Sequence, residues 1–339
     1  MNSNLKSQIS PSAIINSNCR IIGNNVSIGH NCEIGEEGIV VIENCQLGNN
    51  VKLKSGFFKD SVFLDNSSMG SNSYVRGGTL LEEFASGAHC VGFKETILFP
   101  YAKTGSLINF CDALLSGGTD LKNHSEIGSS YVHFNYTINK DKATPSLFGN
   151  VIDGIFLDQN PIFLGGQGGA VGPINVAFGS KITAGSILRK DYLKSNQIIS
   201  EPHIKEYEKD YIPNFRSNLE KIIENNFNYI GSIAALRAWY KYVRSLYIKD
   251  IFHESLIKGA EQLLLNSFKE RIKQINTITD TKYTIDFPKI DPISNKFINN
   301  LKVTDDYIND IKNISPSVKE MGKIWIKKII DDIKKIYRG

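Results

Sequence analysis

The chain has 339 residues, of which 41% are hydrophobic and 22% charged, and its formal net charge is +4. This composition is that of an ordinary soluble protein with room for two domains. The positive surplus lies in residues 201–339, where basic and acidic residues are interleaved. A nucleic-acid-binding surface needs a concentrated basic stripe instead, so we expect no nucleic-acid partner.

The N-terminus and the cysteines bear on the cellular setting. Residues 1–10 are polar and contain no apolar core of an export signal, and no apolar run in the chain reaches the roughly 20 residues of a membrane span. The five cysteines are odd in number and lack Cys-x-x-Cys spacing. We therefore expect reduced thiols, a cytoplasmic location and no membrane partner.

Internal repetition dominates residues 1–200. Ile22-Gly23, Ile28-Gly29 and Ile34-Gly35 follow one another every six residues, and the period returns with Ile182 and Leu188. Six residues suit a short strand followed by a tight turn, which Gly or Asn makes at positive φ. Strands of a β-sandwich recur at about 8–12 residues instead. The repeat therefore predicts a mainly β fold, a parallel β-helix of stacked coils over residues 1–200.

The composition changes near residue 200. Of the 28 glycines, 24 precede this point, and beyond it apolar residues recur at three-to-four spacing. We predict an α-helical domain over residues 201–339, with a linker or small strand at Asn276–Pro292. The expected helices are Ile204–Asn226, Ile230–Asp250, Glu254–Gln274, Asp305–Asn313 and Val318–Arg338.

Residues 93–191 carry an ordered series of motifs outside the repeat. This part of the chain resembles the acetyltransferase half of the bifunctional N-acetylglucosamine-1-phosphate uridyltransferase/glucosamine-1-phosphate acetyltransferase family, over about 100 residues. The hexapeptide coils before it match that family in kind only. The segments that carry the resemblance are Gly92-Phe93-Lys94-Glu95, Lys103-Thr104-Gly105-Ser106-Leu107, Asn135-Tyr136-Thr137, Lys142-Ala143-Thr144, Thr183-Ala184-Gly185-Ser186 and Arg189-Lys190-Asp191.

The resemblance implies a left-handed β-helix, a homotrimer with its sites between subunits, and acetyl-CoA as co-substrate. The acceptor it implies is a sugar phosphate or a nucleotide sugar. By this resemblance the cofactor-binding residues are Asn135, Tyr136 and Ala184. The substrate-binding residues are Lys103, Lys142 and Glu95, with both lysines at phosphate groups.

The chain departs from this family at two points. No glycine-rich nucleotide-binding loop precedes the repeats, so we do not expect nucleotidyl transfer. The family's general base is a histidine at the position of Ser106, and a serine hydroxyl cannot hold a proton near neutral pH.

Replacement bases come from the segment between the second and third motifs, which is longer than the family's by about one hexapeptide. His124 and His133 lie there, and each reads equally as a catalytic base or as an outward-facing residue bonded to a neighbouring coil. We interpret His30 and His89 as structural. No set of metal ligands stands out, so no metal is predicted.

Two functions from different classes follow. The first is an acyl-CoA-dependent acyltransferase with His133 or His124 as base. The second is a non-catalytic trimeric scaffold or sugar-nucleotide sensor, which Ser106 and the added helical domain motivate. A γ-class carbonic anhydrase on the same fold needs three zinc histidines, and the histidine spacing gives that possibility little support.

Overall fold

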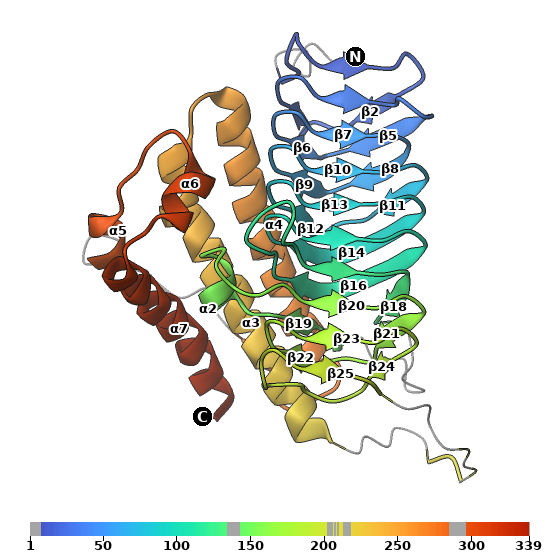
Figure 1. Cartoon of the computed structure of the whole chain (residues 1–339), viewed down its shortest axis with the longest axis vertical. Coiled ribbons are helices and arrows are strands. Elements are labelled where there is room, and N and C mark those ends of the chain that lie inside the picture. The colour runs from blue at the N-terminus through green and yellow to red at the C-terminus, as the bar shows by residue number, and fades with distance from the viewer. Residues whose placement is uncertain are drawn as a thin grey trace.

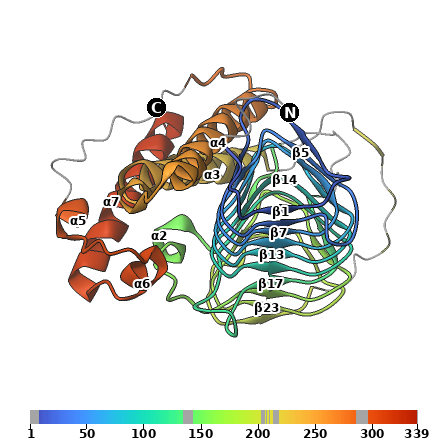
Figure 2. The ribbon, with the colours of Figure 1, turned by 90° about the horizontal axis from the view of Figure 1, so that it is seen from above.

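The structure, a computed structural model, describes residues 8–133, 143–201, 206, 208, 210–212, 218–284 and 296–338. Short parallel strands stack into a three-faced left-handed β-helix, and helices lie along one of its sides (Figures 1 and 2). The predicted fold class, a β-helix of hexapeptide repeats followed by an α-helical region, is confirmed. No helix among the described residues is long and apolar enough to cross a membrane.

We name the three faces of the β-helix A, B and C. Strands β14 (Val91–Leu98) and β16 (Ile108–Leu115) bend through both face A and face C, and so join these faces into one sheet. Face A otherwise contains β2 (Arg20–Ile22), β5 (Val40–Glu43), β8 (Gly56–Lys59), β11 (Ser73–Val75), β18 (Ser130–Val132), β21 (Gly168–Ala170) and β24 (Ile187–Leu188). Face C otherwise contains β3 (Ser27–Ile28), β6 (Gln46–Leu47), β9 (Ser61–Phe63), β12 (Thr79–Leu81), β19 (Ser146–Phe148) and β22 (Asn175–Val176).

Face B is a separate ten-stranded sheet and fronts the view in Figure 1. It contains β1 (Ile14–Ile15), β4 (Glu33–Ile34), β7 (Lys52–Leu53), β10 (Ser68–Met69), β13 (Ser86–Gly87), β15 (Lys103–Thr104), β17 (Glu126–Ile127), β20 (Phe163–Leu164), β23 (Lys181–Ile182) and β25 (Ile198–Ile199).

The repeat sets the interior and the corners of the coils. Within each short strand one side chain points inward, and the parallel register stacks these into aliphatic ladders such as Ile34, Leu53 and Met69. Asparagines hold many corners with φ in the left-handed region, for example Asn50 (57°) and Asn66 (62°). Asn tolerates this region better than most residues, which explains its frequency between the repeats.

Face C carries a second, outward-facing apolar ladder. Val62, Leu80, Ile97, Leu114 and Leu147 stack on successive coils, and each is at least 98% buried. The helical layer covers them, since they share one hydrophobic cluster with the helices. Burying each such side chain contributes roughly 1.5–3 kcal/mol, so this ladder accounts for the docking of the helices onto face C.

Two long helices form the inner layer on face C. These are α3 (Leu219–Tyr242) and α4 (Ile251–Ile275), joined by the 3-10 turn η1 (Arg244–Tyr247). Helix α3 is continuous through residues 227–229, where the sequence predicts a break between two helices. Helix α4 matches the predicted Glu254–Gln274. The remaining helices are α2 (Val151–Gly154), α5 (Lys296–Asn300), α6 (Tyr307–Lys312) and the outermost helix α7 (Pro316–Arg338).

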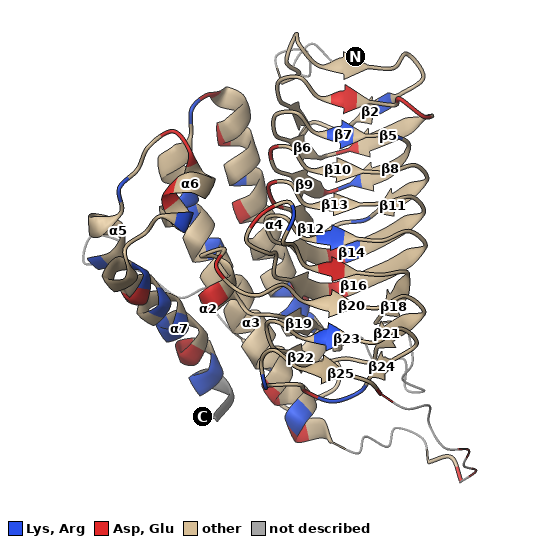
Figure 3. Cartoon of the chain, in the orientation of Figure 1, with Lys and Arg blue, Asp and Glu red and all other residues tan. Residues whose placement is uncertain are grey.

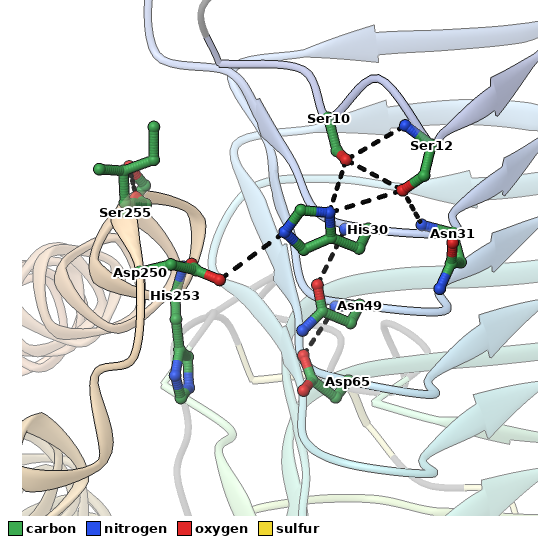
Figure 4. Close-up of polar contacts among 10 residues, drawn as sticks. Ser10, Ser12, His30, Asn31, Asn49, Asp65, Asp250, His253 and Ser255 are labelled. Carbon is green, nitrogen blue, oxygen red and sulfur yellow. Dashed lines mark hydrogen bonds and ion pairs between the residues drawn. The ribbon is translucent and has the colours of Figure 1, made fainter.

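Polar contacts tie the helices to the coils at several heights. Near the N-terminal end, Asp250 caps α4 and lies 3.7 Å from His30 Nε2, while His30 Nδ1 lies 2.7 Å from Ser10 Oγ (Figure 4). Further along, the Arg271 guanidinium pairs with Asp112 at 2.9 Å.

The central contact is a buried ion cluster. The Arg244 side chain, 2% exposed, donates Nη2 to Glu83 Oε2 at 2.8 Å and pairs with Glu83 through Nη1 as well. It also lies 3.5 Å from Glu82, which accepts a hydrogen bond from Tyr240 Oη at 2.6 Å. The helices and the outward side chains of face C form one hydrophobic cluster. The division of the chain at residue 200 into two separate domains stays a prediction.

Candidate functional site

A polar groove crosses face B and has a volume of about 630 Å³. Its floor follows the outward ladder Lys52, Ser68, Ser86 and Lys103, in which the two short serines leave room between the lysines. The volume lies within the usual range for small-molecule sites. Lysines and carboxylates occur together on this face (Figure 3).

His89 forms one edge of the groove, where face B turns into face A. The side chain is exposed, and its Nδ1 lies 2.7 Å from Ser106 Oγ on the next coil. If Nδ1–H donates to the serine, Nε2 carries the lone pair and can accept a proton. Ser106 is then a positioning residue that fixes the tautomer of the imidazole.

His124 and Glu126 form the other edge. His124 Nδ1 lies 2.9 Å from the Leu121 carbonyl, and Nε2 lies 3.4 Å from Glu126 Oε2. Both ring nitrogens therefore face oxygen acceptors, which favours donation from the ring over proton abstraction by it.

Lys103 supplies the free positive charge in the groove. Within the described part of the chain it forms no ion pair, whereas Lys52 is 2.9 Å from Glu33 and Lys54 is paired with Glu37. An unpaired ammonium at the floor of a polar groove suits a phosphate group. Among the described residues no cluster of three or more His, Cys, Asp or Glu side chains is placed to hold a metal ion.

Comparison with known proteins gives a partial match. No family model matches the chain. It is similar to the bifunctional protein GlmU of Thermotoga petrophila, with 29% identity over 145 residues, which are 42% of this chain and 28% of that protein. The GlmU of Thermotoga maritima is 28% identical over the same length. LpxA from Acinetobacter baumannii aligns with 78% of this chain and 97% of its own, at 16% identity and a TM-score of 0.27, which is too low to carry an argument.

The two GlmU proteins agree with the resemblance drawn from the motifs. The chain resembles a hexapeptide-repeat acetyltransferase. Because it spans only 28% of the length of the GlmU proteins it matches, their activity is for this chain a proposal. At the position of the family's histidine, Ser106 holds the His89 imidazole, which comes from the preceding coil.

The predicted site residues divide between several places. Lys103 and His124 lie together in the groove. Glu95 lies in a different cavity beside α4, where burial raises the pKa of its carboxyl group. Ala184 is exposed between β23 and β24, outside the groove lining. The predictions for Asn135, Tyr136 and Lys142 lie outside the described residues.

His133 also lies outside the groove. Its Nδ1 accepts a hydrogen bond from the Gly172 N–H at 3.1 Å. Burial, with a smaller contribution from the positive charge of Arg271, lowers the pKa of His133 to about 3. A ring that is neutral and so weakly basic is a poor proton acceptor at neutral pH. Its role as the base stays a prediction, and these contacts weigh against it.

The structure thus adds His89, which the sequence alone indicates to be structural, to the candidate site. The repeat itself indicates that His89 lies next to Ser106. Ser86-Gly87-Ala88-His89 and Lys103-Thr104-Gly105-Ser106 occupy equivalent positions on successive coils, since Ser86 pairs with Lys103 and Gly87 with Thr104. Residues equivalent by repeat are neighbours in space, although 17 residues separate them.

Proposed function

We propose that the chain is an acyl-CoA-dependent acyltransferase whose reacting groups lie in the face B groove. The observation that carries this proposal is the His89–Ser106 contact, which returns an imidazole to the place where the resembled family has its histidine. The acceptor is a sugar phosphate or a nucleotide sugar, with its phosphate at Lys103. Acetyl-CoA is the expected acyl donor.

In this proposal His89 Nε2 takes the proton from an acceptor amine or hydroxyl as that group attacks the thioester carbonyl. The new C–N or C–O bond forms as the C–S bond breaks, and the CoA thiol leaves with a proton. General-base assistance of this kind contributes roughly 10²–10⁴-fold to the rate. His124 and Glu126, at the opposite edge, would orient the acceptor by hydrogen bonds.

The working unit is proposed to be a homotrimer in the cytoplasm. Three apolar side chains are exposed on face B outside the groove: Ile14 (70%), Phe163 (40%) and Ile198 (83%), and a neighbouring subunit would cover them. All five cysteines are free thiols, which fits a reducing compartment. Light scattering of the purified chain measures the mass and so tests the trimer.

The test of the activity is thiol release from acetyl-CoA across a panel of amino-sugar phosphates and nucleotide sugars. We expect His89→Ala to lower kcat by roughly 10²–10⁴-fold with little change in KM. Ser106→Ala should cause a smaller loss. Lys103→Gln should raise KM for the phosphorylated acceptor. Lys181→Gln, on the same face three strands further along, is the matched control and should leave both constants unchanged.

His124→Ala and His133→Ala test the bases predicted from the sequence. Full turnover in His89→Ala together with a loss in either of these variants would transfer the role of base to that histidine. No thiol release with any acceptor would refute the enzyme proposal altogether.

The second candidate is a non-catalytic sugar-nucleotide-binding protein, and Ser106 is the observation that favours it. This alternative predicts calorimetric binding of nucleotide sugars without any binding of acetyl-CoA.

A further inference from the structure

A second polar cavity, separate from the groove, lies between helix α4 and the corner that joins faces A and C. Its volume is about 500 Å³. We call it the α4 slot. The corner side contributes Asn25, Asn44 and Gln46, and α4 contributes Gln262 and Asn266. Five side-chain amides in one cavity of this size form an environment that both donates and accepts hydrogen bonds.

Contacts within the protein leave six of the ten side-chain amide atoms available to a ligand. Gln46 Nε2 donates to the Asn25 carbonyl at 2.7 Å, and Asn44 Oδ1 accepts from the Asn25 N–H at 3.4 Å. Gln262 Nε2 donates to Asn266 Oδ1 at 2.9 Å. Among the described residues nothing bonds to Nδ2 of Asn25, Asn44 and Asn266 or to the side-chain oxygens of Asn25, Gln46 and Gln262. Three donors and three acceptors therefore remain, and a hydroxyl group can pair with either kind.

The charge of the slot is negative. Asp60, Glu95 and Glu270 line it, against the single ammonium of Lys94. Because burial raises the pKa of Glu95, the negative charge rests on Asp60 and Glu270. Within the described residues the Asp60 carboxylate has no hydrogen-bond or ion-pair partner, so it can accept from a ligand. This balance repels phosphate and attracts an amine.

The end of the slot adjoins an incompletely bonded arginine. Ser267 and Glu270 line this end and are close neighbours of Arg271 on α4. The Arg271 side chain is 3% exposed and uses Nη2 for Asp112, but its buried Nε and Nη1 lack a hydrogen-bond partner among the described residues. Buried donors without partners are rare because each costs about 1–3 kcal/mol. Arg271 does not itself line the slot, so these donors mark its end as incompletely bonded without forming part of its lining.

We propose that the α4 slot binds a polyhydroxylated amine, such as an unphosphorylated amino sugar. The amides pair with ring hydroxyls, and the ammonium meets Asp60. This site is independent of the transferase groove, whose ligand carries phosphate. It also gives the helical layer a role beyond covering face C.

Calorimetry on the full chain tests the site with three probes: glucosamine, glucose and glucosamine 6-phosphate. We expect glucosamine to bind most tightly and glucose more weakly. Measured in Lys103→Gln, which removes the cation of the groove, glucosamine 6-phosphate should bind at least tenfold more weakly than glucosamine. Asn266→Trp fills the slot from an exposed position on α4 and should weaken glucosamine binding at least tenfold.

Lys269→Trp is the matched control, because this exposed residue of the same helix does not line the slot. It should leave glucosamine binding unchanged. The proposal is overturned if Asn266→Trp binds glucosamine like the unmodified chain, if Lys103→Gln abolishes that binding, or if none of the probes binds. Equal affinity for the phosphate ester in Lys103→Gln would also overturn it. Thiol release should survive Asn266→Trp, which separates this proposal from the transferase proposal.

Discussion

Arg244→Met removes the central charge of the buried cluster while keeping much of its aliphatic volume. The guanidinium makes two contacts with Glu83, lies 3.5 Å from Glu82 and stacks 3.7 Å from the centre of the Tyr307 ring. Without it, the carboxylates of Glu82 and Glu83, whose side chains are 5% and 12% exposed, lose the cation between them. Breaking a buried ion pair in this way costs about 3–5 kcal/mol, so we expect a loss of that size in the free energy of unfolding at pH 8.

The loss should depend on pH in a defined direction. Burial raises the pKa of Glu82 to about 7, while Arg244 opposes that rise. Removing the arginine raises the folded-state pKa further, so Glu82 takes up a proton on folding. An acid whose folded pKa lies above its unfolded value destabilises the protein at high pH, and this penalty disappears as the pH falls toward the unfolded pKa. The cost of Arg244→Met should therefore be smaller at pH 5 than at pH 8.

Urea unfolding followed by the helical circular dichroism signal measures both quantities. Lys258→Met is the control, since Lys258 forms an exposed pair with Glu254 on α4 that is worth about 0.3–0.5 kcal/mol. Adding Glu83→Gln to Arg244→Met should recover part of the loss by removing one uncompensated charge. A loss below about 1 kcal/mol at pH 8, or one that does not change with pH, would refute the view that this cluster holds the helices to face C.

Three further outcomes follow from the structure. The gain in free energy of unfolding from Glu82→Gln, relative to the unmodified chain, should be larger at pH 8 than at pH 5. The reason is that it removes a carboxyl group whose pKa burial raises to about 7, and unfolding measured at the two pH values checks it. Gly56→Ala should destabilise far more than Gly185→Ala in the same assay. Both have positive φ, but a Cβ at Gly56 would lie 2.1 Å from a carbonyl oxygen, whereas one at Gly185 meets nothing within 4 Å and costs about 1 kcal/mol. Cys32 and Cys45 should resist thiol reagents at neutral pH until the chain unfolds, since burial raises the pKa of each to about 12, and rapid labelling of the native chain at either would contradict this.

The repeat made the β-helix predictable, because a period of six admits few other folds. The position of the helices was also encoded. Val62-Phe63, Leu80-Leu81 and Leu114-Leu115 are apolar pairs in which one side chain points inward and the other outward. Adjacent residues of a strand face opposite sides, so such pairs mark a face buried from both sides. Most strands of face B lack such a pair. In the three that have one, β1, β20 and β25, the outward residue (Ile14, Phe163 or Ile198) is exposed, so that face stays open.

The candidate site was harder to predict than the fold. The motif of the resembled family has its catalytic histidine at one position along the chain, and this chain has Ser106 there. In a solenoid the same place in space is also reached from the preceding coil, which is where His89 lies. For His133, the neighbouring sequence suggested a catalytic role. Its environment comes from distant segments instead: the Gly172 N–H donates to Nδ1, and burial, with a smaller contribution from Arg271, lowers its pKa.

A crystal structure with bound acetyl-CoA would show where the reacting groups lie. We expect the thioester carbonyl in the face B groove, with room for an acceptor amine between it and His89 Nε2. A thioester bound beside His133, with the groove empty, would contradict this expectation.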